Sequence, residues 1–121
     1  IDRQLANKLT RFTFVNFKGF TRNIPFYSYR VLLHTSFTES FGMVFCEAIF
    51  HGVPVLAFEG SGASELVVDQ NGTLVPKNEP HLLQERLKQM VNNPFLTNPV
   101  SVKNYSWAAS SDRYRRLFQD V

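Results

Sequence analysis

The segment Val31–Phe58 constrains the fold more than any other part of the chain. It starts with the apolar run Val31–Leu33 and continues through a polar loop into a largely apolar stretch that begins near Phe41. Gly52 closes that stretch, and a second apolar run follows. This order predicts a strand, a loop that contains a glycine, a helix, a glycine stop and another strand.

Two glutamates, Glu39 and Glu47, flank the start of the predicted helix, with seven residues between them. A strand that leads into a helix through a glycine-containing turn directs backbone N–H groups and the positive end of the helix dipole above the sheet. If the helix begins near Phe41, the two carboxylates are about 12 Å apart in helical rise. A diphosphate at the helix start could then have hydroxyl-binding carboxylates on both sides, as a sugar diphosphonucleoside requires. The alternative is that both glutamates are solvated surface charges, and their spacing alone does not decide.

The residues before this segment predict a helix over Ile1–Leu9 and a buried strand over Phe12–Phe17. Pro25 suits the first turn of a further short helix, with Asn23 as its cap. A chain that starts with a helix feeding an inner strand suggests that upstream sequence is missing. We therefore expect a fragment of a larger protein.

A second glycine-containing loop, Glu59–Glu65, follows the strand that ends at Phe58. Its glycines allow a ligand to approach the backbone closely, or they only make a tight turn. An Asn71–Gly72 turn then leads into a short strand over Thr73–Val75. Ligands of parallel α/β sheets bind at the carboxyl ends of the strands, so we expect this loop and the loop of Glu39 to meet at one crevice.

Two helices are predicted in the last third of the chain. Asn78 or Glu79 is the expected cap of the first helix, and Ser106 of the second. The second helix combines an apolar stripe with a basic face, which is a solvated surface or, alternatively, a contact with a membrane. The stripe consists of Trp107, Tyr114, Leu117 and Phe118, and the basic face of Arg113, Arg115 and Arg116.

The composition, 44% hydrophobic and 19% charged residues, fits a single globular domain over residues 1–121. The alternation of strands and helices predicts a Rossmann-like α/β fold, a parallel sheet with helices on both faces. The net charge of +3 is mild and is compatible with a phosphorylated ligand or an anionic membrane face. The single cysteine, Cys46, excludes a disulfide framework and favours a reducing, cytoplasmic compartment. Three scattered histidines have no metal-ligand spacing, so we expect no metal site.

Five groups of residues stand in a fixed order along nearly the whole chain. They are Ser36-x-x-Glu39-Ser-Phe-Gly-Met-Val-Phe-Cys-Glu47-Ala, His51-Gly52-Val-Pro54-Val, Ser61-Gly62-x-x-Glu65, Asn71-Gly72-x-Leu-Val-Pro76 and Tyr105-Ser106-Trp107. Together they resemble the carboxyl-terminal domain of the family 4 glycosyltransferases, which are retaining enzymes of the GT-B fold. The resemblance favours a functional role for both glutamates. It also implies that residues 1–121 are the donor-binding domain of a two-domain enzyme whose N-terminal domain is missing.

The resemblance implies a role for each residue of the first group. Glu39 would be the catalytic-site residue that binds hydroxyls of the donor sugar, and Glu47 would bind the ribose hydroxyls. Charge-assisted hydrogen bonds of this kind are about twice as strong as neutral ones. The amides of the loop between the glutamates would meet the sugar and the diphosphate. The predicted donor-binding residues are Phe41, Gly42, Met43, Val44 and Glu47.

The reaction that the resemblance implies has no clear protein nucleophile, and the departing phosphate helps to deprotonate the acceptor. The protein would contribute positioning and electrostatic stabilisation, without a metal or another cofactor. The commonest donor in the family is a UDP-linked hexose, and the acceptor would be a carbohydrate, a lipid-linked molecule or a protein. We expect no nucleic-acid partner, and leave open a peripheral contact with the inner membrane face. The family's diphosphate-neutralising arginine and lysine have no matching motif in residues 1–30, so we expect them upstream and this polypeptide alone to be inactive.

Two other functions remain open. The first is a non-catalytic, glycosyltransferase-like subunit that binds a glycosylated partner or supports a catalytic subunit. Loss of either glutamate would favour that function, and both are present. The second is a general nucleotide-binding module of the same fold, such as an epimerase.

Overall fold

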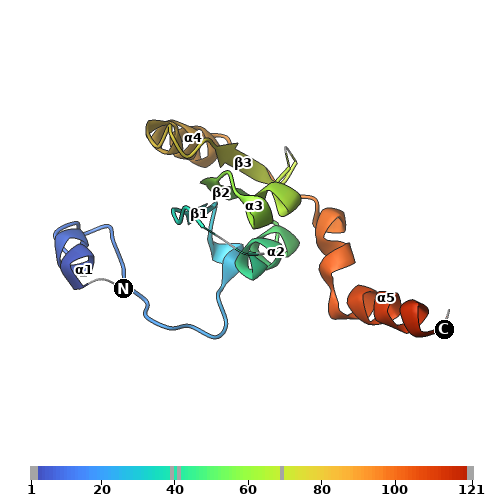
Figure 1. Ribbon diagram of the computed structural model, residues 1–121. Helices are drawn as coiled ribbons and strands as arrows, with labels where there is room; N and C mark the ends of the chain where they lie inside the picture. Colours follow the sequence, from blue (N-terminus) through green and yellow to red (C-terminus); the bar gives the residue numbers. More distant parts are fainter. Residues whose placement is uncertain (1–2, 39, 41, 69, 120–121) are drawn as a thin grey trace.

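The computed structural model of the protein describes residues 3–38, 40, 42–68 and 70–119. Three parallel strands, in the order β1–β2–β3, form its centre (Figure 1). The strands are β1 (Leu32–His34), β2 (Val55–Phe58) and β3 (Gly72–Val75). The helices are α1 (Arg3–Leu9), α2 (Met43–Phe50), α3 (Ser61–Leu66), α4 (His81–Asn92) and α5 (Trp107–Gln119), with 3₁₀ turns η1 (Phe26–Ser28) and η2 (Pro99–Tyr105).

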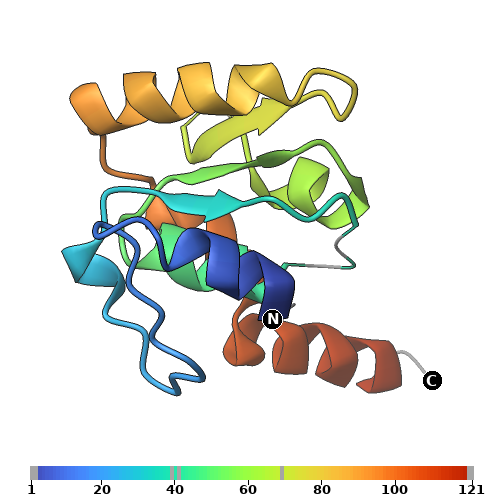
Figure 2. The ribbon, with the colours of Figure 1, turned by 90° about the vertical axis from the view of Figure 1, so that its left-hand side faces the viewer.

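The middle strand, β2, is buried on both faces, and its side chains alternate between two hydrophobic clusters. Val55 and Ala57 belong to the cluster that contains the apolar side of α2, whereas Leu56 and Phe58 pack with α4. Successive side chains of a strand point to opposite faces, so α2 and α4 cover opposite faces of the sheet. Figures 1 and 2 show this layering, with α4 on one side of the strands and α2 on the other. The predicted α/β fold with helices on both faces is therefore confirmed.

Glycine determines where α2 can begin. Gly42 is the N-cap, with a left-handed backbone at φ 79°. A Cβ atom added there would lie 2.5 Å from the ring of Phe45, so both conformation and space exclude a side chain. The helix begins at Met43 and its C-cap, His51, is followed by Gly52 at φ 82°, which confirms the predicted glycine stop.

Residues 12–17 do not form a strand, which corrects the sequence prediction. Phe12, Phe14 and Phe17 are exposed, and the first two contact each other with ring centroids 5.3 Å apart. Strand formation depends on a neighbouring strand and a face to bury. In Figure 1, α1 and the segment after it lie to one side, away from the sheet. An apolar run therefore stays irregular here because no described strand lies beside it.

Two predicted helix caps are also wrong, and a proline takes the place of each. The turn before β1 is the short 3₁₀ turn η1 with Pro25 as its N-cap, rather than a helix capped by Asn23. The N-cap of α4 is Pro80, rather than Asn78 or Glu79. Proline suits the start of both η1 and α4 because its ring already fixes φ at a helical value.

The last helix begins as the sequence predicts. The backbone N–H of Ala109 donates to the hydroxyl oxygen of Ser106 at 3.2 Å, which is an N-cap bond. Trp107, the first member of the predicted apolar stripe, is 90% exposed, so the stripe is not packed at that end. The side chains of Tyr114, Leu117 and Phe118 lie outside the described part of the structure. No helix among the described residues has both the length and the apolarity to cross a membrane.

Candidate functional site

The loop that follows β1 contacts the carboxyl end of the neighbouring strand β2. The ring of Phe37, in the first loop, stacks on Phe58 at the end of β2, with centroids 4.7 Å apart. His34, at the end of β1, packs edge-on against Phe45 in α2 at 5.0 Å. The first contact joins the loop after β1 to the end of β2, and the second joins the end of β1 to the first turn of α2.

Two predicted site residues, Glu39 and Phe41, lie outside the described residues, so their roles stay predictions. The structure places the next residues at the start of α2, where Gly42 is the N-cap and Met43 the first helical residue. The side chain of Met43 is exposed, whereas Val44 packs partly against the core.

Glu47 lies on the exposed side of α2 and lines a cavity of about 370 Å³. The opposite wall comes from the segment before η1, with Arg22 and Asn23. His51, one helical turn after Glu47, also lines the cavity, and its ring stacks on the buried Phe26 at 5.7 Å. This cavity therefore brings together a carboxylate, a guanidinium and an amide, which can bind hydroxyl and phosphate groups.

A second cavity, of about 230 Å³, also includes Glu47. Its other wall is formed by η2 and the residue after it, with Lys103, Tyr105 and Ser106. Tyr105 and Ser106 also line a third cavity, of about 280 Å³, together with Met43. Met43 and Glu47 are four residues apart and share one face of α2, so Tyr105 lies beside two of the predicted donor-binding residues.

A side-chain hydrogen bond joins α3 to η2 across this region. The hydroxyl of Tyr105 donates to Oε1 of Glu65 at 2.8 Å, and this bond raises the pKa of Tyr105 because the neutral phenol is the donor. Cys46, on α2, has a raised pKa as well, first through burial and then through the negative charge of Glu47. Burial and the negative charge of Glu47 therefore both disfavour the thiolate of Cys46.

Three basic side chains near the predicted donor-binding residues were not identified from the sequence. A Cβ atom added at Gly60 would lie 3.9 Å from Nζ of Lys77, so Lys77 brings an ammonium group to the glycine-containing loop after β2. Arg22 and Lys103 line the two cavities that contain Glu47. No sequence signal pointed to them, because they lie far from the glutamates in the chain and outside any motif. Within the described residues, no group of three histidine, cysteine or acidic side chains could hold a metal ion.

A parallel α/β sheet in which the helix after the first strand starts at a glycine N-cap has the architecture of a nucleotide-binding domain. Residues 4–113 match the family model described as glycosyl transferases group 1. The chain belongs to this family, and its domain has the Rossmann-like α/β fold of the GT-B type.

Three relatives illustrate the range of the family. An uncharacterised glycosyltransferase of Methanocaldococcus jannaschii is 30% identical over 93% of this chain and 33% of its own length. The D-inositol 3-phosphate glycosyltransferase of Corynebacterium diphtheriae is 30% identical over 71% of this chain and 22% of its own length. The lipopolysaccharide glucosyltransferase WaaG of Escherichia coli is 30% identical over 79% of this chain and 27% of its own length. The chain thus spans at most about a third of the length of these relatives.

Proposed function

We propose that the chain is the nucleotide-sugar-binding domain of a family 4 retaining glycosyltransferase and that its donor is a UDP-linked hexose. The observation that carries the proposal is the position of Glu47, the second glutamate of the motif, in two cavities beside α2. The family match over residues 4–113 supports glycosyl transfer as the reaction class.

The start of α2 is the proposed diphosphate site. A glycine N-cap has no side chain to bind the first-turn amides, so a ligand oxygen can approach the N–H groups of Met43 and Val44. Glu47, one turn further along the helix, would accept hydrogen bonds from the ribose hydroxyls. Glu39 would bind hydroxyls of the transferred sugar on the other side of the diphosphate.

The proposed reaction breaks the bond between the anomeric carbon and the diphosphate oxygen and forms a new bond from that carbon to an acceptor hydroxyl on the same face. The acceptor proton passes to the departing diphosphate. The chain's own contribution is to hold the donor and to stabilise the charge that develops on the leaving group. Arg22, Lys103 and Lys77 are proposed as sources of positive charge, because each lines a cavity or loop next to the motif residues.

The acceptor would be bound by a second, N-terminal domain of a larger cytoplasmic enzyme, with residues 1–121 as the donor-binding domain. One of the relatives is a D-inositol 3-phosphate glycosyltransferase and another a lipopolysaccharide glucosyltransferase. We propose a carbohydrate, a lipid-linked molecule or a protein as the acceptor class here.

Screening nucleotide sugars against the full-length protein tests the proposed reaction. We expect release of UDP from a UDP-hexose, and we expect Glu39→Gln to lower turnover by at least 100-fold while circular dichroism stays unchanged. Unchanged turnover in that variant would remove Glu39 from the donor site. Nucleotide-sugar binding without any transfer or hydrolysis would instead favour a non-catalytic subunit.

A further inference from the structure

Tyr105 stands between two of the cavities beside α2. It lines the cavity of about 230 Å³ together with Glu47 and the cavity of about 280 Å³ together with Met43. Its ring is partly buried and packs against the cluster that contains the apolar side of α2. Glu47 and Met43 are both predicted donor-binding residues and lie about one helical turn apart. The ring of Tyr105 is therefore a wall that both cavities share.

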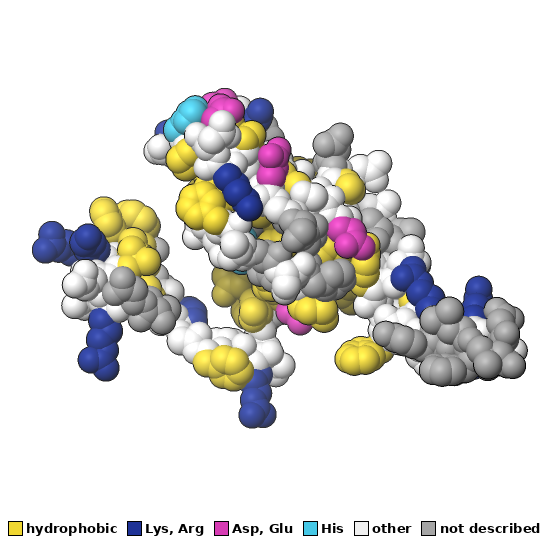
Figure 3. Space-filling model, viewed as in Figure 1, with side chains coloured by type: hydrophobic (Ala, Val, Ile, Leu, Met, Phe, Trp, Pro, Cys, Tyr) yellow, Lys and Arg dark blue, Asp and Glu magenta, His cyan; other side chains and the backbone are white. Residues whose placement is uncertain are grey.

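Two carboxylates lie near this wall, and the phenol engages one of them. The hydroxyl of Tyr105 donates to Oε1 of Glu65 at 2.8 Å. Burial raises the pKa of the Cys46 thiol first, and the negative charges of Glu47 and Glu65 add to it, so both charges act on the same side of α2. Figure 3 shows acidic side chains on the part of the molecule that contains the sheet and its covering helices. An anionic donor bound at α2 therefore has carboxylates near it as well as cations.

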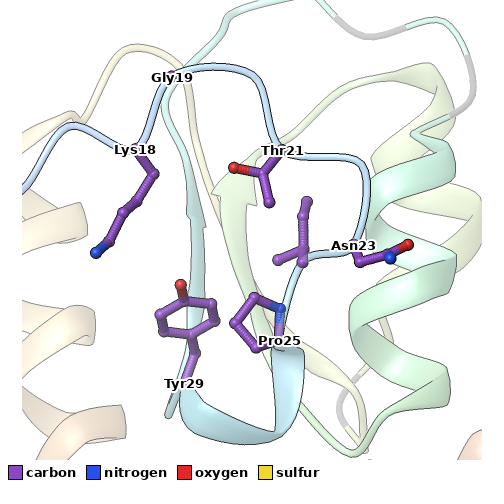
Figure 4. Close-up of a pocket in the computed structure, with 7 residues that line it drawn as sticks. Lys18, Gly19, Thr21, Asn23, Pro25 and Tyr29 are labelled. Carbon is purple, nitrogen blue, oxygen red and sulfur yellow. The ribbon is translucent and has the colours of Figure 1, made fainter.

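The two sides of Glu47 differ in chemistry. On one side, the cavity of about 370 Å³ has polar walls from Arg22 and Asn23. In Figure 4 the side chain of Asn23 points away from the larger hollow of about 540 Å³ in the segment before β1. On the other side of Glu47, Tyr105 and Phe50 give the cavity aromatic walls. The shape of that second side therefore depends on how the ring of Tyr105 is held.

We propose that Tyr105 is a positioning residue of the donor site, which holds the carboxylate of Glu65 away from the diphosphate and leaves Glu47 as the carboxylate that binds hydroxyls. This inference rests on the proposed function, because it concerns the same site. A diphosphate is negatively charged, and a carboxylate released beside it would repel it. A hydrogen bond to a charged acceptor is directional and fixes the position of the carboxylate.

The place of Tyr105 predicts which kinetic constant depends on it. Tyr105 lines the cavity of Glu47, which is the ribose end of the proposed donor site rather than the end at the reacting anomeric carbon. An interaction at that end is equally strong in the ground state and in the transition state, so its loss raises KM and leaves kcat unchanged. A role in folding alone would instead lower stability without a selective change in KM.

Steady-state kinetics of the full-length protein with a UDP-hexose test this role. We expect Tyr105→Phe to raise KM for the donor about fivefold, the factor that corresponds to one hydrogen bond, and to keep kcat within about twofold. The double variant Tyr105→Phe with Glu65→Gln should return KM to within about twofold of the parent, because the released charge is removed together with the bond. The matched control is Tyr27→Phe, which removes a phenolic hydroxyl from a ring that is 84% exposed and should change neither constant.

The ionisation of Tyr105 gives a readout that needs no donor. The phenolate absorbance of Tyr105 is the difference between two proteins that differ only by Tyr105→Phe. In the background Glu65→Gln this absorbance should rise at a lower pH, because the hydrogen bond to Glu65 is the first cause of the raised pKa of Tyr105. An unchanged ionisation in Glu65→Gln would overturn the inference.

The kinetic outcomes separate this inference from the proposed function. An unchanged KM in Tyr105→Phe would overturn the inference and leave the proposed function standing, as would a double variant with a KM as high as that of Tyr105→Phe. A loss of kcat at unchanged KM would also overturn it, because it would place Tyr105 at the reacting atoms. If the parent binds UDP without turnover, dissociation constants of UDP replace KM in the same comparison. Failure of the parent to bind UDP or to use a UDP-hexose would contradict both.

Discussion

The sheet and the segment before it each contain an apolar run, but one run is a buried strand and the other is irregular and exposed. Residues 55–58 are buried on both faces of the sheet, whereas residues 12–17, which contain the same number of apolar side chains, are irregular and largely exposed. The difference lies in the neighbours, because β2 has a parallel strand on each side and a helix on each face. An apolar run becomes a strand only where the rest of the chain supplies something to pair with and pack against.

The largest effect that separates the two regions should come from truncating one large apolar side chain in each. Leu56 is fully buried between β3 and α4, so Leu56→Ala should lower the free energy of unfolding by about 3 kcal/mol through lost burial and a cavity. Phe14→Ala should change it by less than about 0.5 kcal/mol, because the ring already lies in water. Urea denaturation measures both values. A Phe14→Ala loss as large as that of Leu56→Ala would show that residues 12–17 belong to the core.

Two left-handed glycines offer a second, smaller contrast. Gly42→Ala should cost about 2–3 kcal/mol, because φ of 79° disfavours a side chain and the new Cβ would strike the ring of Phe45. Gly19→Ala should cost about 1 kcal/mol, since its φ of 66° is similar but no atom lies within 4 Å of the added Cβ. Thermal unfolding of the two variants gives the comparison. Equal losses would mean that the crowding at the start of α2 relaxes without cost.

The Tyr105–Glu65 hydrogen bond should contribute least and should depend on pH. Tyr105→Phe should lower the free energy of unfolding by about 0.5–1 kcal/mol at pH 7, at the low end because both groups are accessible to water. The bond raises the pKa of Tyr105 in the folded state, so its contribution is complete below the unfolded pKa of about 10. It is lost as the pH rises through the higher folded value. Denaturation of the parent and variant at pH 7, 9 and 11 should therefore give a difference that is constant between the first two and smaller at the third.

The sequence predicts the sheet and its helices well because their signals are local. Leu83, Leu87 and Met90 share one face of α4 by their helical spacing and pack in one cluster with the sheet, and Gly52 ends α2 as predicted. The N-caps of η1 and α4 were less predictable, because in each case a proline and a polar residue lie close together and either can occupy the N-cap position. The strand predicted over residues 12–17 failed for a non-local reason, the lack of a neighbouring strand.

The candidate site could be predicted only in part. The motif around Glu47 was visible in the sequence, but the cavity walls come from Arg22 and Asn23 on one side and from Lys103 and Tyr105 on the other. These residues are far apart in the chain, and only the fold brings them to one helix face. Arg22 belongs to no cation motif, so the sequence of residues 1–30 does not reveal its place beside Glu47.

The reactivity of Cys46, the single cysteine, tests the central claim most directly, because the thiol lines a cavity with Glu47 and the negative charge of Glu47 helps to raise the pKa of the thiol. We predict that saturating UDP-hexose slows alkylation of Cys46 by iodoacetamide at least threefold at pH 8. We also predict that Glu47→Gln abolishes this protection. Glu47→Gln alone should speed alkylation of the free protein, because removal of the negative charge lowers the pKa of the thiol. Equal protection of the parent and of Glu47→Gln would contradict the assignment of Glu47 to the donor site. The assignment would also be contradicted if alkylation were faster in the variant but no nucleotide sugar protected the parent.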